Sequence, residues 1–326
     1  MSSTWKSTLP RDPLPALLDY PDPALTWFIH RDLLETAAGP VESLWELPEA
    51  LRLVGKQQAN GSWRYPARTN HPATNANYDL LETYRSLRIL VEMYGFQAEH
   101  PTIGKAAEYV FSCQTDAGDI RGILGNQYMP YYHAAILEEL IKAGYAKDAR
   151  TLKGLQWLLS MRQADGGWII PAQLVPSGRR TDQFWKGLPV PPDRSQPHAH
   201  LATGMILRAF AAHPDYWQLP EVVTAGERLK ERFFLADKYN DRRAPSYWLK
   251  YQFPFWWPSL LTALDTLSWL GFDRNDKDIT RGLAWFTANQ SRDGLWETSY
   301  GFGKDAGRMR HWVGLTICRV LKRFFG

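Results

Sequence analysis

Apolar residues recur three and four positions apart in one kind of segment along the chain. In the segment 148–162, the leucines Leu152, Leu155, Leu158 and Leu159 fall on one side, which is the pattern of an amphipathic helix. Four further segments share this pattern, namely residues 46–57, 102–113, 220–234 and 278–289. We predict that all five are helices with one buried face.

A second kind of segment is more apolar and follows the first kind along the chain. Its members are residues 23–34, 78–94, 132–143, 199–212, 257–270 and 312–325. A helix that is apolar nearly all round is expected to be covered on both faces. No run alternates with a period of two for long enough to predict a sheet. We therefore predict an all-helical chain of alternating outer and inner helices, in which the first inner helix has no outer helix before it.

A short motif follows each outer helix. Its copies are Gln58-Ala-Asn-Gly-Ser-Trp63, Gln114-Thr-Asp-Ala-Gly118, Gln163-Ala-Asp-Gly-Gly-Trp168 and Gln290-Ser-Arg-Asp-Gly-Leu-Trp296, with a degenerate copy at Leu235-Ala-Asp-Lys-Tyr239. The Asp/Asn-Gly pair ends a helix and turns the chain. Because a repeated helix pair cannot bury its apolar face alone, it must stack on its neighbours.

These patterns predict an all-α fold of the α/α toroid (barrel) type, a single domain over residues 1–326 with five to six pairs of inner and outer helices. Closure around a central cavity is favoured over an open superhelix, because Phe324 and Phe325 at the end of the chain need a place to be buried. The proline-rich insertion 171–197 interrupts the repeat. We expect a lid over the cavity there, and a simple surface excursion is the alternative.

Composition narrows the function classes. The chain has 326 residues, a net charge of +4 and two cysteines, which argues against a nucleic-acid binder, a disulfide framework and a cysteine-rich metal site. It has no apolar stretch long enough to span a membrane and no signal-peptide pattern at its start, so we expect a cytoplasmic location. Aromatic residues make up 13% of the chain and include 15 tryptophans, so rings must form much of the core or line a cavity.

The Gln-to-Trp copies resemble the QW repeats of squalene and oxidosqualene cyclases and the related repeats of protein prenyltransferase β-subunits. The copies that end at Trp63 and Trp168 are especially close to the pattern, and the resemblance covers nearly the whole chain. It implies an α/α barrel in which these residues tie the outer helices to the turns that follow. The chain is most similar to stand-alone, single-toroid members of this superfamily.

The resemblance does not carry over the family's catalytic motifs. The Asp-x-Asp-Asp acid motif of squalene cyclases, the Asp-x-Cys zinc motif of prenyltransferases and the Gly-Cys-Gly-Glu-Gln run of thioester proteins are all missing from the sequence. We expect no cofactor. Zinc held by His133, His200 and His311, each near the start of an inner helix, is the alternative, and the same residues could equally cap a solvated rim.

Candidate site residues fall into three groups. The first group holds the proposed catalytic residues, Asp79, Asp265, His133 and His311. A buried carboxyl on an inner helix could donate a proton, and Glu82 and Glu138 are further acids of this kind. The alternative is a structural role, in which these carboxyls pair with arginines on neighbouring helices. The second is a basic set, Lys304, Arg308 and Arg310 with His311, which by resemblance could hold a diphosphate or else form a solvated loop. The third comprises side chains expected to line the cavity: Asn77, Tyr78, Tyr131, Tyr132, His200, Phe255, Trp256, Trp257 and Trp312. Their rings suit an isoprenoid chain and its carbocations, or else plain core packing.

Three functions stay open. The first is a squalene/terpene cyclase-like or prenyltransferase-like enzyme that acts on an isoprenoid or other apolar ligand. The second is a non-catalytic toroid that binds a lipid or a protein partner. The third is a carbohydrate-active α/α toroid, which would need two carboxylates facing each other across the mouth. For partners, we expect an apolar small molecule or lipid, no nucleic acid, no transmembrane segment, and at most peripheral contact with a membrane.

Overall fold

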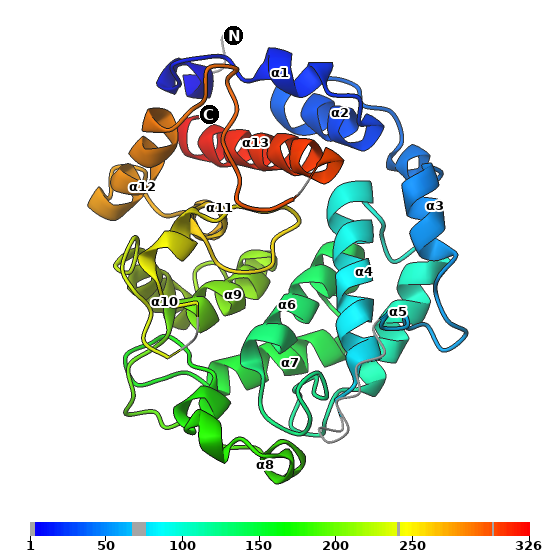
Figure 1. The fold of residues 1–326 in the computed structure, drawn as a ribbon, viewed down its shortest axis with the longest axis vertical. Coiled ribbons are helices and arrows are strands. Elements are labelled where there is room, and N and C mark those ends of the chain that lie inside the picture. The colour runs from blue at the N-terminus through cyan, green and yellow to red at the C-terminus, as the bar shows by residue number, and fades with distance from the viewer. Residues whose placement is uncertain (1–3, 67–75, 240–241, 302) are drawn as a thin grey trace. The chain divides into compact units, whose positions relative to one another are not determined.

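The computed structural model describes residues 4–66, 76–239, 242–301 and 303–326. Over these residues the chain is all-helical and has no β-strand, which confirms the predicted class (Figure 1). The α-helices are α1 (Leu14–Asp19), α2 (Pro23–Ile29), α3 (Pro48–Val54), α4 (Tyr78–Tyr94), α5 (Pro101–Ser112), α6 (Pro130–Leu140), α7 (Ala149–Ser160), α8 (Asp182–Lys186), α9 (His200–Ala211), α10 (Pro220–Lys230), α11 (Leu260–Trp269), α12 (Lys277–Ala288) and α13 (Lys304–Phe325).

The chain forms two compact units. Unit 1 consists of Met1–Pro40, Gly226–Asp237 and Arg242–Gly326, and unit 2 consists of Val41–Ala225 and Lys238–Asp241. The closed ring and the single domain predicted from the sequence both depend on how the two units join, and both stay predictions. None of the described helices is long and apolar enough to cross a membrane.

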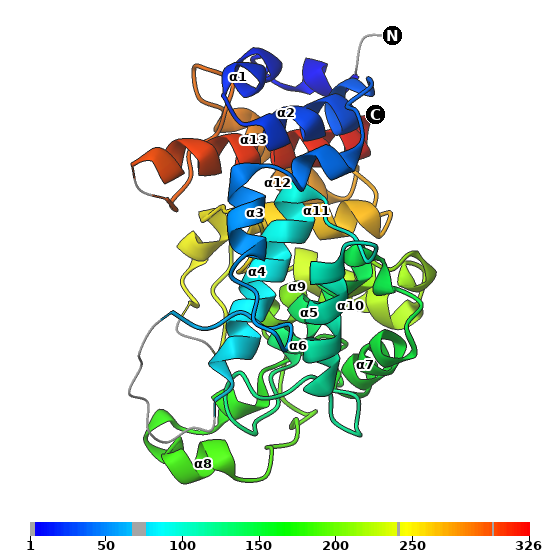
Figure 2. The same ribbon diagram turned by 90° about the vertical axis from the view of Figure 1, so that its right-hand side faces the viewer.

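Unit 2 contains three inner helices in a row. Helix α6 packs against α4 on one side and α9 on the other, and the outer helix α7 covers α6 (Figures 1 and 2). All residues of α6 and α9 are buried, as their apolar sequences predict. The outer helix α7 buries one face, which includes Leu155 and Leu158, and leaves Leu152 partly exposed.

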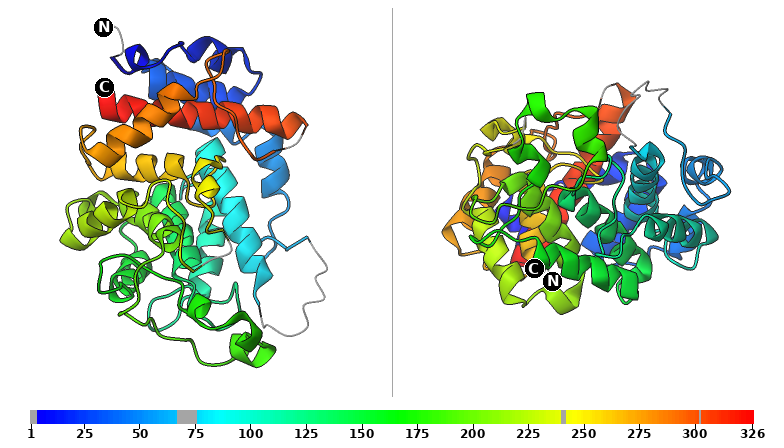
Figure 3. Two further views of the ribbon diagram at one scale, coloured as in Figure 1. Left: turned by 60° about the vertical axis from the view of Figure 1, so that its left-hand side comes forward. Right: turned by 90° about the horizontal axis from the view of Figure 1, so that it is seen from below.

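Unit 1 contains the other three inner helices. Helix α13 lies between α2 and α11, so the first and last helices of the chain are neighbours (Figure 3, left). Two sequence predictions need correction here. A short outer helix, α1, does precede the first inner helix, because Pro13 and Asp12 start a turn that Leu14 and Leu17 bury. The last inner helix begins at Lys304 rather than at residue 312.

In its first two copies, the polar motif ties an outer helix to the next outer helix. The side chain of Gln114 donates from Nε2 to Gly118 O and to Arg150 O of the next outer helix, at 2.7 and 2.8 Å. In the first copy Gln57 makes these bonds, to Gly61 O and Thr102 O, so the motif begins one residue earlier than predicted.

The third copy is shifted in the same way. Arg162 takes the place of the glutamine and donates from Nε to Gly166 O. The predicted Gln163 instead donates to the backbone of the insertion, at Asp193 O and Gln196 O.

The tryptophans of the motif anchor the turn to the preceding outer helix. The indole N–H of Trp63, Trp168 and Trp296 donates to the carbonyl ten residues earlier, at Leu53, Leu158 and Phe286, over 2.7–2.8 Å. The degenerate copy makes a related bond: Trp248 donates from Nε1 to Leu235 O at 2.9 Å, but this carbonyl lies thirteen residues earlier and after the end of α10. The turn glycine is also required by space: Gly61 has a φ of 90°, and a Cβ there would lie 2.1 Å from Lys105 O.

Candidate functional site

Ionisable side chains gather among the three inner helices of unit 2. We call this group the inner charge cluster; it comprises Tyr84, Arg88 and Glu92 of α4, Glu138 and Glu139 of α6, Lys142 of the turn that follows α6, and Arg208 of α9. Helix α6 places two adjacent glutamates in an otherwise apolar run. Because this helix is buried all round, neither carboxyl can reach solvent: Glu138 is 2% exposed and Glu139 is 1% exposed.

Glu138 is held ionised by two cations. The Arg208 guanidinium lies 2.6 Å from one of its oxygens, and the Lys142 ammonium lies 2.7 Å from the other. Burial works to raise the pKa of Glu138, but Arg208 and Lys142 together outweigh it and lower this pKa. Lys142 also pairs with Glu92, so a single ammonium joins α4 to the end of α6.

Glu139 has a different environment from its neighbour. Neither of its oxygens has a hydrogen-bond partner among the described residues. Burial raises the pKa of Glu139 well above its ordinary value, and the carboxylates of Glu92 and Glu138 raise it further. The environments of the two adjacent glutamates therefore shift their pKa values in opposite directions: the pKa of Glu138 is lowered, which favours the anion, and that of Glu139 is raised, which favours the protonated acid.

Three tyrosine rings form a group on α4 and α6. Tyr132 precedes Glu139 by seven residues on α6, which places both on the same side of the helix, two turns apart. Tyr84 meets Tyr132 edge-on with ring centroids 6.4 Å apart, and the ring centroids of Tyr131 and Tyr132 are 4.3 Å apart. Burial raises the pKa of Tyr84 to about 12, and the charge of Glu139 contributes to this rise, so the phenol stays neutral. The same face of α6 therefore carries an aromatic group and, two turns further on, a carboxyl with a raised pKa.

Two of the four predicted catalytic residues lie in unit 2, and both have structural roles. His133 accepts the Ile120 N–H at Nδ1 and donates from Nε2 to Gly154 O, at 3.0 and 3.1 Å. Burial lowers the pKa of His133 to about 4, so the ring is neutral. Asp79 accepts from Tyr65 N and from the Gln58 side chain, which orders the turn before α4.

The other two predicted catalytic residues lie in unit 1. Asp265 of α11 pairs with Arg323 of α13, so the expected arginine partner on a neighbouring inner helix is present. His311 donates from Nδ1 to Gly307 O within α13 and stacks on Tyr20 at 4.0 Å. His311 is also in the third turn of α13 rather than at the start of the helix, because the helix begins at Lys304.

The basic set is part of α13 rather than of a loop. Arg308 donates from Nε to Asp22 at 2.8 Å, and Arg310 forms a two-pronged pair with Asp293. The side chain of Lys304 lies outside the described residues. A bound diphosphate would therefore compete with these carboxylates for the arginines, and the anion site stays a prediction.

The residues predicted to line a cavity divide between the units. In unit 2, Asn77 caps α4 by accepting from Leu80 N, Tyr78 stacks on Tyr65, and His200 is the buried first residue of α9. Tyr131 and Tyr132 contact each other on α6, with ring centroids 4.3 Å apart.

In unit 1, Trp312 is fully buried and stacks on Phe253 at 5.3 Å, and Phe255 meets Phe253 edge-on. Trp256 and Trp257 are half-buried neighbours with centroids 6.1 Å apart. The structure thus brings Phe255 and Trp312 into one aromatic group. Whether any of these rings contacts a ligand stays a prediction.

The zinc alternative does not fit the geometry of the histidines, because both ring nitrogens of His133 are already used in hydrogen bonds. Among the described residues, Glu92, Glu138 and Glu139 do place carboxylate oxygens within 4.8 Å of one another. However, Lys142 and Arg208 already pair with two of these carboxylates, and burial raises the pKa of the third, Glu139, which disfavours its charged form. This donor set suits proton transfer better than a divalent cation.

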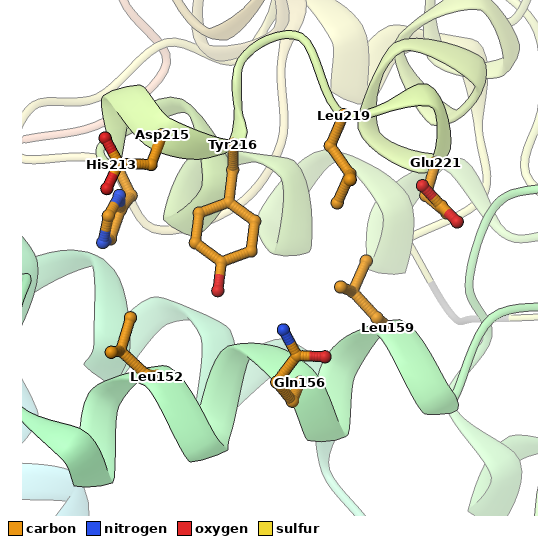
Figure 4. Close-up of a pocket in the computed structure, with 8 residues that line it drawn as sticks. All are labelled: Leu152, Gln156, Leu159, His213, Asp215, Tyr216, Leu219 and Glu221. Carbon is orange, nitrogen blue, oxygen red and sulfur yellow. The ribbon is translucent and has the colours of Figure 1, made fainter.

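A separate groove lies on the outer side of unit 2. Its volume is about 450 Å³, and it runs between α7 and the segment that leads into α10 (Figure 4). It is lined by Leu152, Gln156, Leu159, His213, Asp215, Tyr216, Leu219 and Glu221. The Tyr216 hydroxyl and the Gln156 amide point into it from opposite sides. None of the candidate site residues predicted from the sequence lines this groove.

Sequence reasoning named Glu138 but missed Glu139. A signal was present, because two consecutive glutamates stand near the end of the apolar run Ala134–Leu140. On a helix that is buried all round, adjacent charges cannot both turn outward, so at least one must be paired or neutral. The sequence does not reveal which glutamate receives the cations, since Arg208 comes from a helix about seventy residues later.

Comparison with known proteins gives structural similarity only. No protein-family model and no curated protein matches the chain. A crystal structure of a protein from Actinoplanes is similar at 16% identity, with a TM-score of 0.44 over 93% of this chain and 90% of that one. The type II terpene cyclase MstE from Scytonema is similar at 13% identity, with a TM-score of 0.43 over 98% of this chain and 84% of that one. Similarity at this level does not assign an activity.

Proposed function

We propose that the chain is an isoprenoid cyclase-like enzyme in which Glu139 donates the proton that starts the reaction. The observation that carries this proposal is the environment of Glu139: its carboxyl is buried, it has no hydrogen-bond partner among the described residues, and burial together with the charges of Glu92 and Glu138 raises its pKa. A carbon–carbon double bond is a weak base, so its protonation needs a donor that keeps its proton until the substrate is bound and a site without competing water. The raised pKa of Glu139 keeps the proton in place but makes Glu139 a weaker acid than an ordinary glutamate, so the transfer depends on stabilising the carboxylate and the carbocation that it forms.

Two further features support the proposal. Protonation of a double bond creates a carbocation, and the faces of nearby aromatic rings stabilise such a cation when water is excluded. Tyr84, Tyr131 and Tyr132 are buried on α4 and α6, and the proposal places the substrate along the two turns of α6 between Tyr132 and Glu139. When Glu139 loses its proton, the new carboxylate gains attraction from Lys142 and Arg208, which lowers the energy of the charged product state.

The proposed substrate is an isoprenoid chain, either a squalene-type hydrocarbon or a prenyl diphosphate. It would occupy a cavity inside a ring of inner helices, and both the cavity and the ring are parts of the proposal. The ties made by the Gln and Trp residues of the repeat turns support that architecture.

The test is product formation by the wild type and by Glu139→Gln. Glutamine keeps the size of the side chain and is neutral, as protonated Glu139 is, so the variant should fold. Because general acids contribute roughly 10²- to 10⁴-fold to rates, we expect Glu139→Gln to lose at least a hundredfold in kcat while the control Glu49→Gln, on the exposed surface of α3, keeps full activity. If the wild type converts no squalene-type or prenyl diphosphate substrate, or if Glu139→Gln keeps its rate, the proposal is wrong.

A non-catalytic toroid that binds a lipid is the second candidate function. The specific observation in its favour is that Asp79, Asp265 and His133 make hydrogen bonds or ion pairs that join structural elements, and that His311 bonds within α13. Native mass spectrometry of the purified protein distinguishes the two. A retained, chemically unchanged lipid in a protein that turns over no isoprenoid would support the binding function.

A further inference from the structure

The insertion that interrupts the repeat presents the most exposed large apolar side chain among the described residues. Leu188 is 89% exposed, whereas the other exposed leucines and tryptophans are between 36% and 47% exposed. Leu188 follows the short helix α8, which lies at the lower edge of unit 2 in Figures 1 and 2. Phe184 and Trp185 of α8 are half-buried and meet edge-on, with ring centroids 5.0 Å apart.

The backbone around Leu188 is fixed by two side chains of a preceding loop. Gln127, which is 1% exposed, donates to Phe184 O at 2.6 Å and to Leu188 O at 3.2 Å, and it accepts from Val190 N at 3.0 Å. Asn126 donates from its backbone to Trp185 O and from its side chain to Gly187 O. Five hydrogen bonds thus hold residues 184–190, and prolines follow Leu188 at positions 189, 191 and 192.

A leucine held rigidly in water gains nothing for the fold, because its side chain is not buried. Rigid presentation does reduce the entropy lost when the side chain is buried against something else. The fixed backbone and the projecting side chain together therefore indicate a surface shaped for insertion.

Charges around the tip indicate what it inserts into. Arg179 and Lys186 are exposed and form no ion pair among the described residues, and Arg194 is also exposed. Asp182 of α8 is also exposed, and Asp193 accepts hydrogen bonds from Ser195 and Gln196. Residues 179–194 therefore carry four basic and two acidic side chains, a net charge of +2. The tip thus combines a projecting leucine, a tryptophan and net positive charge, which is the combination found in segments that bind the surface of anionic bilayers.

We propose that residues 179–194 form a membrane-docking tip that inserts Leu188 into the surface of an anionic bilayer. A bilayer is favoured over a protein partner because the hydrocarbon accepts a single projecting side chain without a matching pocket. A stable protein interface would need a far larger complementary patch, about 800 Å² on each partner. The inference does not depend on the proposed chemistry, although it would place the enzyme where apolar isoprenoids are dissolved.

The experiment is co-sedimentation of the full chain with vesicles of pure phosphatidylcholine and of phosphatidylcholine with one third phosphatidylglycerol. We expect binding to the anionic vesicles and much weaker binding to the neutral ones. Leu188→Ser should lower the affinity for anionic vesicles by roughly tenfold to a hundredfold, because burying one leucine side chain strengthens binding by about that factor. Lys186→Glu should lower it by about fivefold or more and reduce the preference for phosphatidylglycerol.

The matched control is Leu51→Ser, which removes a leucine that is 47% exposed on α3 of the same unit. It should bind as the wild type does, and the circular dichroism spectra of all variants should agree. Failure of the wild type to bind anionic vesicles would overturn the proposal. So would equal binding by Leu188→Ser and wild type, or an equal loss in Leu51→Ser.

Discussion

At the residue scale, the two glutamates at the end of α6 show how the neighbours of a buried carboxyl decide its charge. Arg208 and Lys142 lower the pKa of Glu138, whereas burial and the charges of Glu92 and Glu138 raise the pKa of Glu139. The stability of the protein therefore depends on pH in opposite directions at these two positions. The raised pKa favours a proton held on Glu139 inside a layer of apolar helices.

The raised pKa of Glu139 leads to a stability prediction. The folded state holds the Glu139 proton more tightly than the unfolded chain does. The contribution of this proton to the free energy of unfolding is therefore complete below the ordinary glutamate pKa, and it is lost as the pH rises through the pKa of Glu139 in the folded protein. Urea denaturation of the wild type and of Glu139→Gln at pH 5 to 9 measures this. The wild type should lose stability relative to the variant as the pH rises, and parallel profiles would show that Glu139 is not held protonated.

His133 should act with the opposite sign. Its pKa is about 4 in the folded protein and 6.5 in the unfolded chain, so stability should fall as the pH drops from 6.5 to 4, by about 3 kcal/mol in total. His133→Gln offers an acceptor and a donor that do not titrate in this range. The free energy of unfolding of this variant should change less between pH 6.5 and pH 4 than that of the wild type. An unchanged slope would contradict the neutral, doubly bonded ring.

At the element scale, the repeat is defined by hydrogen bonds rather than by identical residues. Arg162 replaces a glutamine in the third copy, and Trp248 still donates to Leu235 O although the fourth turn has lost its glutamine and glycine. A second bond recurs in the same way. In the first and third copies, the backbone N–H of the motif tryptophan donates to Thr83 or Thr203. In the second copy, the backbone N–H of Ile120 donates to His133 instead.

This equivalence predicts that Trp168→Phe and Trp248→Phe destabilise the protein to a similar degree. Each substitution removes an indole N–H that bonds a backbone carbonyl, Leu158 O or Leu235 O, so each should cost about 1–3 kcal/mol in the free energy of unfolding. Trp269→Phe is the control, because Trp269 is 44% exposed, and it should cost under about 0.5 kcal/mol. Urea unfolding of the three variants is the measurement. A negligible effect of Trp248→Phe would mean that the degenerate copy is not a working repeat.

Much of the fold could be predicted from the sequence because the periodicity is strong. The inner helix α4 spans the predicted residues 78–94. The inner helix α11 begins three residues later than predicted, because Ser259 and Thr262 form a capping box just after Pro258. The motif register was missed where two candidate residues are adjacent, as with Gln57 and Gln58. The raised pKa of Glu139 was missed because it depends on Glu92, on another helix, and burial is not a local property of sequence.

At the scale of the whole molecule, the contacts within unit 1 bear on the proposed ring. Gln290 exchanges two hydrogen bonds with Arg11, Asp22 accepts from Arg308 and Trp312, and Asp32 pairs with Arg319. The first and last helix pairs of the chain are therefore neighbours. A ring of repeats requires this relation between its ends, whereas an open superhelix keeps its ends apart. The toroid of six inner helices remains our proposal.

The central claim is that this protein starts isoprenoid cyclisation with a proton from Glu139, and isotope labelling tests it most directly. When the reaction runs in D₂O, the exchanged Glu139 carboxyl delivers deuterium to carbon, so the product should carry one carbon-bound deuterium by mass spectrometry. Glu139→Gln should form almost none of this product. A product without deuterium, formed with release of diphosphate, would show that the reaction begins by ionisation and would contradict the account.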